Sequence, residues 1–256
     1  MNARDAGRSR IMPPVVGILS LVAIAAIVEA LLRADLLNRF ILPLPSQIAL
    51  AFERIIVEEN VLARFVATTT EAVVAGALVT LVGIAAGVLL HRVRILRAAC
   101  ETWVAALAAA PIVLCYPLFL VTFGRSATTI VMMGFVAALP PVILKTIEGL
   151  AATKRVLIDV GRSFNGTASQ LFWKIMLPSA LPTIFVGLRL GLIFALINIV
   201  GVEFLINFGG LGQLINELAE RYDLPGTYAA IGFVILVSVL FFFVSERVER
   251  WLLPKA

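Results

Sequence analysis

Charged and metal-binding side chains are scarce in this sequence. Only 14% of the 256 residues are charged, against about 25% in soluble domains, whereas 61% are hydrophobic. With two cysteines and a single histidine, His91, the chain offers no cluster of metal ligands. Cys100 and Cys115 lie in one apolar segment, where a helix would separate them by about 22 Å, so they cannot form a disulfide with each other. The composition is that of a polytopic membrane protein.

Motifs for catalysis and for nucleotide binding are also absent. The chain contains no Gly-x-x-x-x-Gly-Lys-Ser/Thr sequence, so it cannot cradle ATP phosphates by that motif. No paired carboxylates and no Ser/His constellation stand at a predicted membrane interface, which argues against an enzyme. The net charge of +5 does not indicate nucleic-acid binding, because no basic stripe is interleaved with aromatic residues. We therefore expect this chain to bind no cofactor, metal or nucleic acid.

Six apolar segments are long enough to cross a bilayer, which requires a helix of roughly 20 residues. Gly76, Gly83 and Gly87 would let the second segment pack closely against a neighbour. A signal peptide is the alternative reading of the first segment, but its roughly 19 apolar residues and poor cleavage context favour an uncleaved span. We expect one all-α domain over residues 1–256, with spans at 14–32, 65–90, 101–123, 127–150, 183–204 and 228–244.

Lysines and arginines are unevenly distributed over the predicted loops. Fourteen of the 21 fall on the side that carries both termini, the 91–98 turn and residues 145–178. Cytoplasmic loops are enriched in these residues. Both termini and the 151–180 stretch are therefore predicted to lie in the cytoplasm.

A short amphipathic helix is predicted between the first two spans. Pro43 and Pro45 impose an extended entry, and Ser46 then suits a helix N-cap. Apolar residues follow at helical spacing from Ile48 to Ile55. We expect this helix to lie at the membrane surface.

The longest polar stretch of the later chain, from Asp159 to Pro182, predicts a helical hairpin. The chain breaks at Asn165-Gly166, where both residues tolerate left-handed backbone angles. Thr167 or Ser169 would cap a second helix, and Pro178 would end it. Such a projection, with exposed aromatic residues, suits docking of a soluble partner. The alternative is an interfacial loop that packs only against its own bundle.

This stretch also carries a spaced motif. Asp159-Val160-Gly161 is followed by three residues, Asn165, nine residues, Ile175, one residue and Leu177-Pro178. The motif resembles the EAA loop of the permease subunits of ABC-type importers, which reads Glu-Ala-Ala, three residues, Gly, nine residues, Ile, one residue and Leu-Pro. Asn165 replaces the glycine of the family, and asparagine is the commonest other residue in left-handed geometry.

The flanking sequence is similar to the subgroup that handles sulfonates, taurine and nitrate. The resemblance covers roughly residues 40 to 245. The segments that carry it are Leu42-Pro43-Leu44-Pro45-Ser46, Leu177-Pro178-Ser179-Ala180-Leu181-Pro182, Gly187-Leu188-Arg189, Glu203-Phe204 and Gly210-Leu211-Gly212.

The resemblance implies a type I ABC importer fold in the bacterial inner membrane, with a coupling loop at 155–180 between spans four and five. It implies two ATPase subunits that hold ATP and Mg, a second permease in a homodimer, and a periplasmic or lipid-anchored solute-binding protein. The solute would be small and anionic or polar. An ATP-independent secondary transporter or channel is the alternative function. The expected coupling residues are Asp159, Gly161, Arg162, Phe164, Asn165, Gly166, Phe172, Lys174 and Pro178.

Ionisable residues and prolines inside the spans are candidates for the transport path. Arg189 would face the path and attract an anion, or else pair with an acid on a neighbouring span. Pro111 and Pro117, like Pro140-Pro141, would break helices and free carbonyls to line a cavity, or only kink them. Acidic residues near the outer ends of spans would form an outer gate or a binding-protein contact, or pair with Arg33, Arg64 or Arg125; these are Glu29, Glu71 and Glu203.

Overall fold

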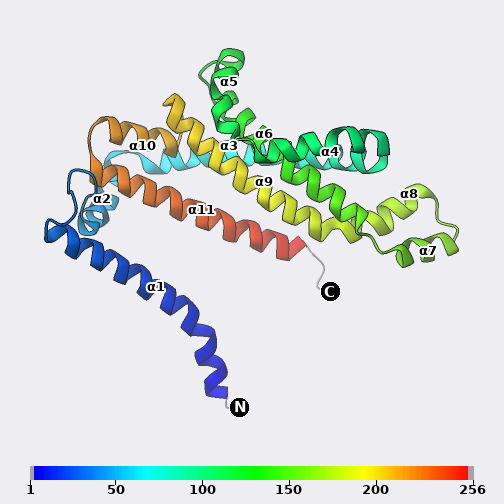
Figure 1. The fold of residues 1–256 in the computed structure, drawn as a ribbon, viewed down its shortest axis with the longest axis horizontal. Helices are drawn as coiled ribbons and strands as arrows, with labels where there is room; N and C mark the ends of the chain where they lie inside the picture. Colours follow the sequence, from blue (N-terminus) through cyan, green and yellow to red (C-terminus); the bar gives the residue numbers. More distant parts are fainter. Residues whose placement is uncertain (1–2, 253–256) are drawn as a thin grey trace.

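The computed structural model describes residues 3–252, with side chains from Val15 to Trp251, and this part of the chain contains helices and no strands. Three long helices, Val61–Arg92, Ala127–Ala151 and Leu177–Ile206, supply most of the core of the bundle (Figure 1). The elements are α1 (Ala3–Arg33), α2 (Pro45–Glu58), α3 (Val61–Arg92), α4 (Arg94–Ala109), the 3-10 turn η1 (Ile112–Cys115), α5 (Tyr116–Phe123), α6 (Ala127–Ala151), α7 (Arg155–Ser163), α8 (Ala168–Leu171), the π turn η2 (Phe172–Met176), α9 (Leu177–Ile206), α10 (Leu211–Glu220) and α11 (Leu224–Leu252).

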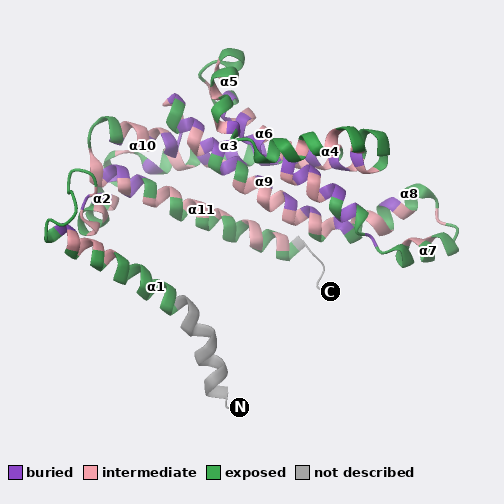
Figure 2. Ribbon diagram, in the orientation of Figure 1, coloured by how far each residue is buried: buried purple, intermediate pink, exposed green. Residues whose placement is uncertain are grey.

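Helix α6 lies between α3 and α9 and packs against both. The approach to α3 is close because α3 presents glycines: a Cβ at Gly87 would lie 2.5 Å from Cβ of Thr146 on α6. The expected role of these glycines in helix packing is confirmed. Figure 2 shows the buried residues concentrated along these three helices. They include Val79 on α3, Met133 and Val142 on α6, and Ile199 on α9.

The two ends of the bundle carry different elements. Figure 1 shows α2 and α10 at one end and α7 and α8 at the other. At the α10 end, α2 buries Ala51 and Ile55 against Leu214 and Leu218 of α10, so its apolar face packs on protein. Helix α1 reaches this end with its C-terminal residues and diverges from the bundle toward its N-terminus, and most of its described side chains are exposed.

In the described part of the chain, five helices are long and apolar enough to cross a membrane, or six if a bent pair counts as one span. The bent pair is α4 with η1–α5, which covers the predicted span 101–123 and turns by 93°. Pro111 lies at the bend and Pro117 in the first turn of α5. By contrast, α6 continues through Pro140 and Pro141, so the predicted helix break there is wrong. Packing between α3 and α9 holds α6 helical despite its two missing donors.

The prediction that Pro178 ends the second helix of the hairpin is also wrong. Helix α8 continues through η2 into α9, with Pro178 in the first turn of α9 and Pro182 inside it. The backbone N–H of Leu177 donates to the carbonyl of Phe172, five residues back. This wider π turn relieves the clash that a proline ring makes with a carbonyl four residues earlier, so the helix passes through.

Candidate functional site

Asn165 forms the turn of the hairpin, which comprises residues 155–176. Its φ of 53° is left-handed, as predicted. The backbone N–H of Asn165 donates to the carbonyl of Arg162 at 2.8 Å, and that of Gly166 donates to the carbonyl of Gly161 at 3.1 Å. These two bonds make a Schellman motif, which satisfies the last carbonyls of α7. The turn therefore survives the replacement of glycine by asparagine.

The second arm of the hairpin begins with a capping box. The Thr167 hydroxyl accepts from the Gln170 backbone N–H at 3.3 Å, and the Gln170 side chain accepts from the Thr167 N–H at 2.8 Å. Thr167 is thus the cap, one of the two residues predicted for that role. Gly161 closes the hairpin, because a Cβ there would lie 2.5 Å from the ends of Leu171 and Ile175. Local sequence signals and one tight contact fix the shape of the hairpin.

The hairpin exposes apolar side chains at the end of the bundle. Phe164 is 82% exposed and Trp173 is 61% exposed. Phe172 differs from the other predicted coupling residues, because it is buried against Leu150, Ala180 and Ile184 rather than displayed. The exposed members of that set are Asp159, Arg162, Phe164, Asn165, Lys174 and Pro178, whereas Gly161 and Gly166 are half-buried.

A buried polar junction joins α3, α9 and α10 at the opposite end of α9. Glu203 is fully buried there and accepts from the Thr68 hydroxyl and from the Gly212 backbone N–H, both at 2.7 Å. The Thr68 hydroxyl in turn accepts from the Leu211 N–H at 2.9 Å. Glu203 thus places a carboxylate at the N-terminus of α10, where the helix dipole favours negative charge. The Glu203 side chain therefore links α9 to α3 and α10 through hydrogen bonds.

Glu71 lies beside Glu203 in this junction. Both side chains flank Gly209, where a Cβ would lie 3.6 Å from Oε1 of Glu71 and 3.8 Å from Cγ of Glu203. Among the described residues, Oε2 of Glu71 is buried without a hydrogen-bond partner. Within residues 15–251 neither carboxyl group forms an ion pair with an arginine, so the predicted pairs with Arg64 and Arg125 are wrong. Arg64 instead forms an ion pair with Glu217 at 2.7 Å. Arg125 donates to the carbonyls of Ile206, the last residue of α9, and of Asn207, which follows it.

Sequence reasoning missed Thr68 as a partner of Glu203. The signal available was the Gly210-Leu211-Gly212 run. A Cβ at Gly210 would lie 2.6 Å from the Glu203 carboxylate, and one at Gly212 would lie 2.7 Å from the Phe204 backbone nitrogen. These glycines let the start of α10 reach the carboxylate.

Glu29 binds the N-terminus of α2. It accepts from the Ser46 backbone N–H at 3.0 Å and from the Ser46 hydroxyl at 2.8 Å. Its predicted pair with Arg33 is confirmed at 2.7 Å. The prediction that Ser46 is the N-cap of α2 is wrong, because α2 begins at Pro45 and Leu44 occupies the cap position.

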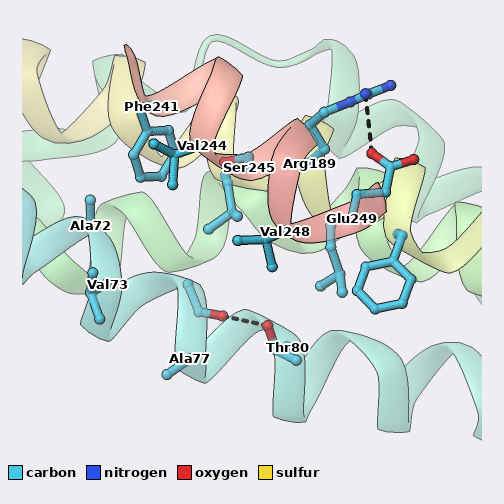
Figure 3. A pocket seen from close by; sticks show the side chains of 14 residues that line it. Ala72, Val73, Ala77, Thr80, Arg189, Phe241, Val244, Ser245, Val248 and Glu249 are labelled. Carbon is cyan, nitrogen blue, oxygen red and sulfur yellow. Dashed lines mark hydrogen bonds and ion pairs between the residues drawn. The ribbon is translucent and has the colours of Figure 1, made fainter. Parts of the chain in front are cut away.

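Arg189 lies at one end of an apolar cavity of about 450 Å³ between α3, α9 and α11 (Figure 3). Its Nη1 forms an ion pair with Oε2 of Glu249 on α11 at 3.1 Å. The contact lacks the angles of a hydrogen bond. The alternative in which Arg189 pairs with an acid on a neighbouring helix is therefore the arrangement observed. Pro111 and Pro117 do not line this cavity, so the structure does not bring the three candidate path residues together.

Proteins with sequences similar to this chain carry the names of transport permeases. Formylaminopyrimidine transport permease protein ThiX of Halalkalibacterium halodurans is 30% identical over 144 residues, which cover 56% of this chain and 58% of ThiX. The glycine betaine/proline betaine transport system permease protein ProW of Escherichia coli is 36% identical over 119 residues, 46% of this chain and 33% of ProW. The taurine transport system permease protein TauC of Escherichia coli is 27% identical over 138 residues, 54% of this chain and 50% of TauC. The chain spans less than two thirds of the length of each.

Solved structures share the fold. A chain of the inward-facing MetNI methionine ABC transporter superposes with a TM-score of 0.66 at 19% identity, over 76% of this chain and 96% of that chain. The model of one protein family, described as the binding-protein-dependent transport system inner membrane component, matches residues 79–255. This match includes α6, the hairpin and α9, and it covers more than half of the sequence. The chain belongs to the family of binding-protein-dependent transport system inner membrane components.

Proposed function

We propose that this chain is the permease subunit of an ATP-driven importer and that the hairpin couples it to an ATPase subunit. The exposed hairpin carries the proposal. It lies within the family match, projects from one end of the bundle and displays Phe164 to solvent. Exposed aromatic residues on a rigid support are the usual anchors of protein interfaces. ATP and Mg would bind the partner ATPase.

The connection between the hairpin and α9 supports coupling. Since α8 continues through η2 into α9, a partner that displaced the hairpin would act on a continuous helix. Helix α9 has 30 residues, or about 45 Å at 1.5 Å per residue, and its far end carries Glu203. A push at one end of α9 would therefore reach the junction at the other end. Glu29, Glu71 and Glu203 would then act at the outer gate or at the contact with a binding protein.

The proposed solute is a small polar or anionic organic molecule. The relatives are named for the transport of a formylaminopyrimidine, betaines and taurine, all of them small polar compounds. Arg189, Pro111 and Pro117 stay candidates for the transport path. Because Glu249 already neutralises Arg189, attraction of an anion would require that pair to open.

The proposed assembly contains two ATPase subunits, two copies of this permease and a solute-binding protein, in a bacterial inner membrane with the hairpin and both termini in the cytoplasm. Spans would cover residues 14–32, 65–90, 101–123, 127–150, 183–204 and 228–244. The distribution of basic residues and the apolar helices support this topology.

Capture of the ATPase subunit tests the proposal. We expect the permease, expressed with the ATPase and binding protein encoded beside it, to co-purify with the ATPase. Phe164→Ala should weaken this capture about tenfold, as expected for loss of an anchor residue worth more than 1 kcal/mol. Phe40→Ala is the matched control, because Phe40 is 90% exposed but lies in the loop between α1 and α2.

Uptake into liposomes separates the proposal from its alternative. The complete assembly should accumulate solute only when ATP is present in the compartment that the hairpin faces. Solute uptake by this chain alone, insensitive to ATP, would instead establish a secondary transporter or channel.

In the capture experiment, an equal loss of ATPase binding in the Phe164→Ala and Phe40→Ala variants would show that the hairpin is not the docking site.

A further inference from the structure

Two adjoining hollows at the hairpin end form one groove with a polar half and an apolar half. The polar half, of about 610 Å³, is lined by His91, Arg92 and Ser169 among others. The apolar half, of about 570 Å³, runs along α3. Both halves share Arg92, Phe172 and Trp173, so they are continuous. We call this surface the hairpin groove.

The polar half presents the positive charge of Arg92, which forms no ion pair with a carboxylate among the described side chains. The guanidinium of Arg92 lies over the Phe172 ring, 4.2 Å from its centroid, and this cation–π contact holds it in the groove. The nearby ion pairs join Arg97 to Glu101 and Lys145 to Glu148, and within residues 15–251 none includes Arg92. Nδ1 of His91 is also buried, and it has no hydrogen-bond partner in the described part of the chain. A ligand with negative charge and hydrogen-bonding oxygens would complement this half.

The apolar half has the length of one membrane leaflet. It is lined on α3 by Leu81, Ile84, Ala85, Val88 and Leu89, and across the groove by Leu177. From Arg92 to Leu81 the helix rises about 16 Å, which is half of a hydrocarbon core about 30 Å thick. Trp173 lies beside Arg92, at the depth where tryptophans gather between lipid headgroups and acyl chains. The groove therefore matches a molecule with an anionic head and one long apolar chain.

We propose that the hairpin groove binds an anionic phospholipid from the leaflet at the hairpin end, with its phosphate at Arg92 and an acyl chain along α3. Basic pockets between membrane helices recognise anionic headgroups in this way. Phe172 and Trp173 belong to the π turn that joins the hairpin to α9. The lipid would therefore touch α3 and the base of the hairpin at once, and brace one against the other.

Quenching of Trp173 by brominated lipids tests this site. The full chain is prepared with Trp103→Phe and Trp251→Phe, so that Trp173 is the remaining tryptophan of the sequence. In mixed vesicles, dibrominated phosphatidylglycerol should quench Trp173 at about fivefold lower mole fraction than dibrominated phosphatidylcholine, the preference expected from one cation near a membrane surface. Arg92→Gln should abolish the preference. Arg94→Gln is the matched control, since it removes the same charge two residues away and outside the groove lining.

A second pair of variants tests the apolar half. Ala85→Phe should fill the groove and reduce quenching by either lipid, whereas Val82→Phe, on an exposed face outside the lining, should not. Native mass spectrometry of the same proteins should show phosphatidylglycerol retained by the parent and lost from Arg92→Gln. Equal quenching by both headgroups, or no quenching because a second copy of the chain covers the groove, would overturn the proposal. None of these readouts requires transport or an ATPase.

Discussion

The hairpin and the buried polar junction lie at opposite ends of α9 and are stabilised in different ways. Turns and caps between residues close in sequence shape the hairpin, which leaves Phe164 exposed. The junction joins Thr68 to residues 135 and 143 positions later in the chain and excludes solvent from Glu203. A surface that must meet a partner can be built locally, whereas a buried carboxylate is tolerated only where several elements supply its hydrogen bonds.

Removal of the junction carboxylate should have the largest effect. Glu203→Ala leaves the Thr68 hydroxyl and the Gly212 N–H buried without their acceptor, at a cost of about 3 kcal/mol in the free energy of unfolding. We expect the melting temperature to fall by roughly 6–12 °C. The control Glu220→Ala, at an exposed position of α10, should change the free energy by less than about 0.5 kcal/mol. Similar melting temperatures for the two variants would contradict this account of the junction.

A glycine-to-alanine substitution should lower stability more in the junction than in the hairpin. Gly212→Ala forces a methyl group toward the Phe204 backbone and the Glu203 side chain, and we expect it to cost about 2 kcal/mol. Gly161→Ala meets only the flexible ends of Leu171 and Ile175 and gains helix propensity, so its effect should stay within about 1 kcal/mol. Thermal unfolding of the two variants in one detergent measures the difference. A larger loss for Gly161→Ala would reverse the comparison.

Backbone strain at the hairpin turn should affect partner binding more than stability. Asn165→Val places a β-branched residue at a φ of 53°, at a local cost of about 1–2 kcal/mol, and should reduce ATPase capture. Asn165→Gly should preserve capture. Asn60→Val is the control, because Asn60 has a φ of 52° and lies before α3 at the α10 end. If Asn60→Val impaired capture equally, the effect would belong to general destabilisation.

The smallest expected effect is the coupling of Arg189 to Glu249. The side chains are 25% and 15% exposed and lack hydrogen-bond geometry, so a double-mutant cycle with Arg189→Gln and Glu249→Gln should give a coupling free energy of about 1 kcal/mol or less. Uptake by the single variants adds a functional test. A larger loss of uptake in Arg189→Gln than in Glu249→Gln would support a role in the transport path, and equal losses would restrict Arg189 to the ion pair.

The hairpin was largely predictable because its determinants are local. Asn165-Gly166 favours a left-handed turn, Thr167 starts a capping box, and neighbouring side chains complete both motifs. The pair of Glu29 with Arg33 was predictable for the same reason, since residues four apart face each other on a helix. The burial of Phe172, one of the expected coupling residues, was not predictable, because its orientation depends on the π turn and on contacts with Leu150 and Ile184.

The sequence by itself determined an all-helical membrane chain, the position of the hairpin and the turn at Asn165, because composition and residues a few positions apart decide these features. Only the tertiary structure decided that Glu203 meets Thr68 and that Arg189 meets Glu249. These outcomes depend on which helices lie side by side and how closely they pack, and the free energy of that packing outweighs the local preferences of single residues.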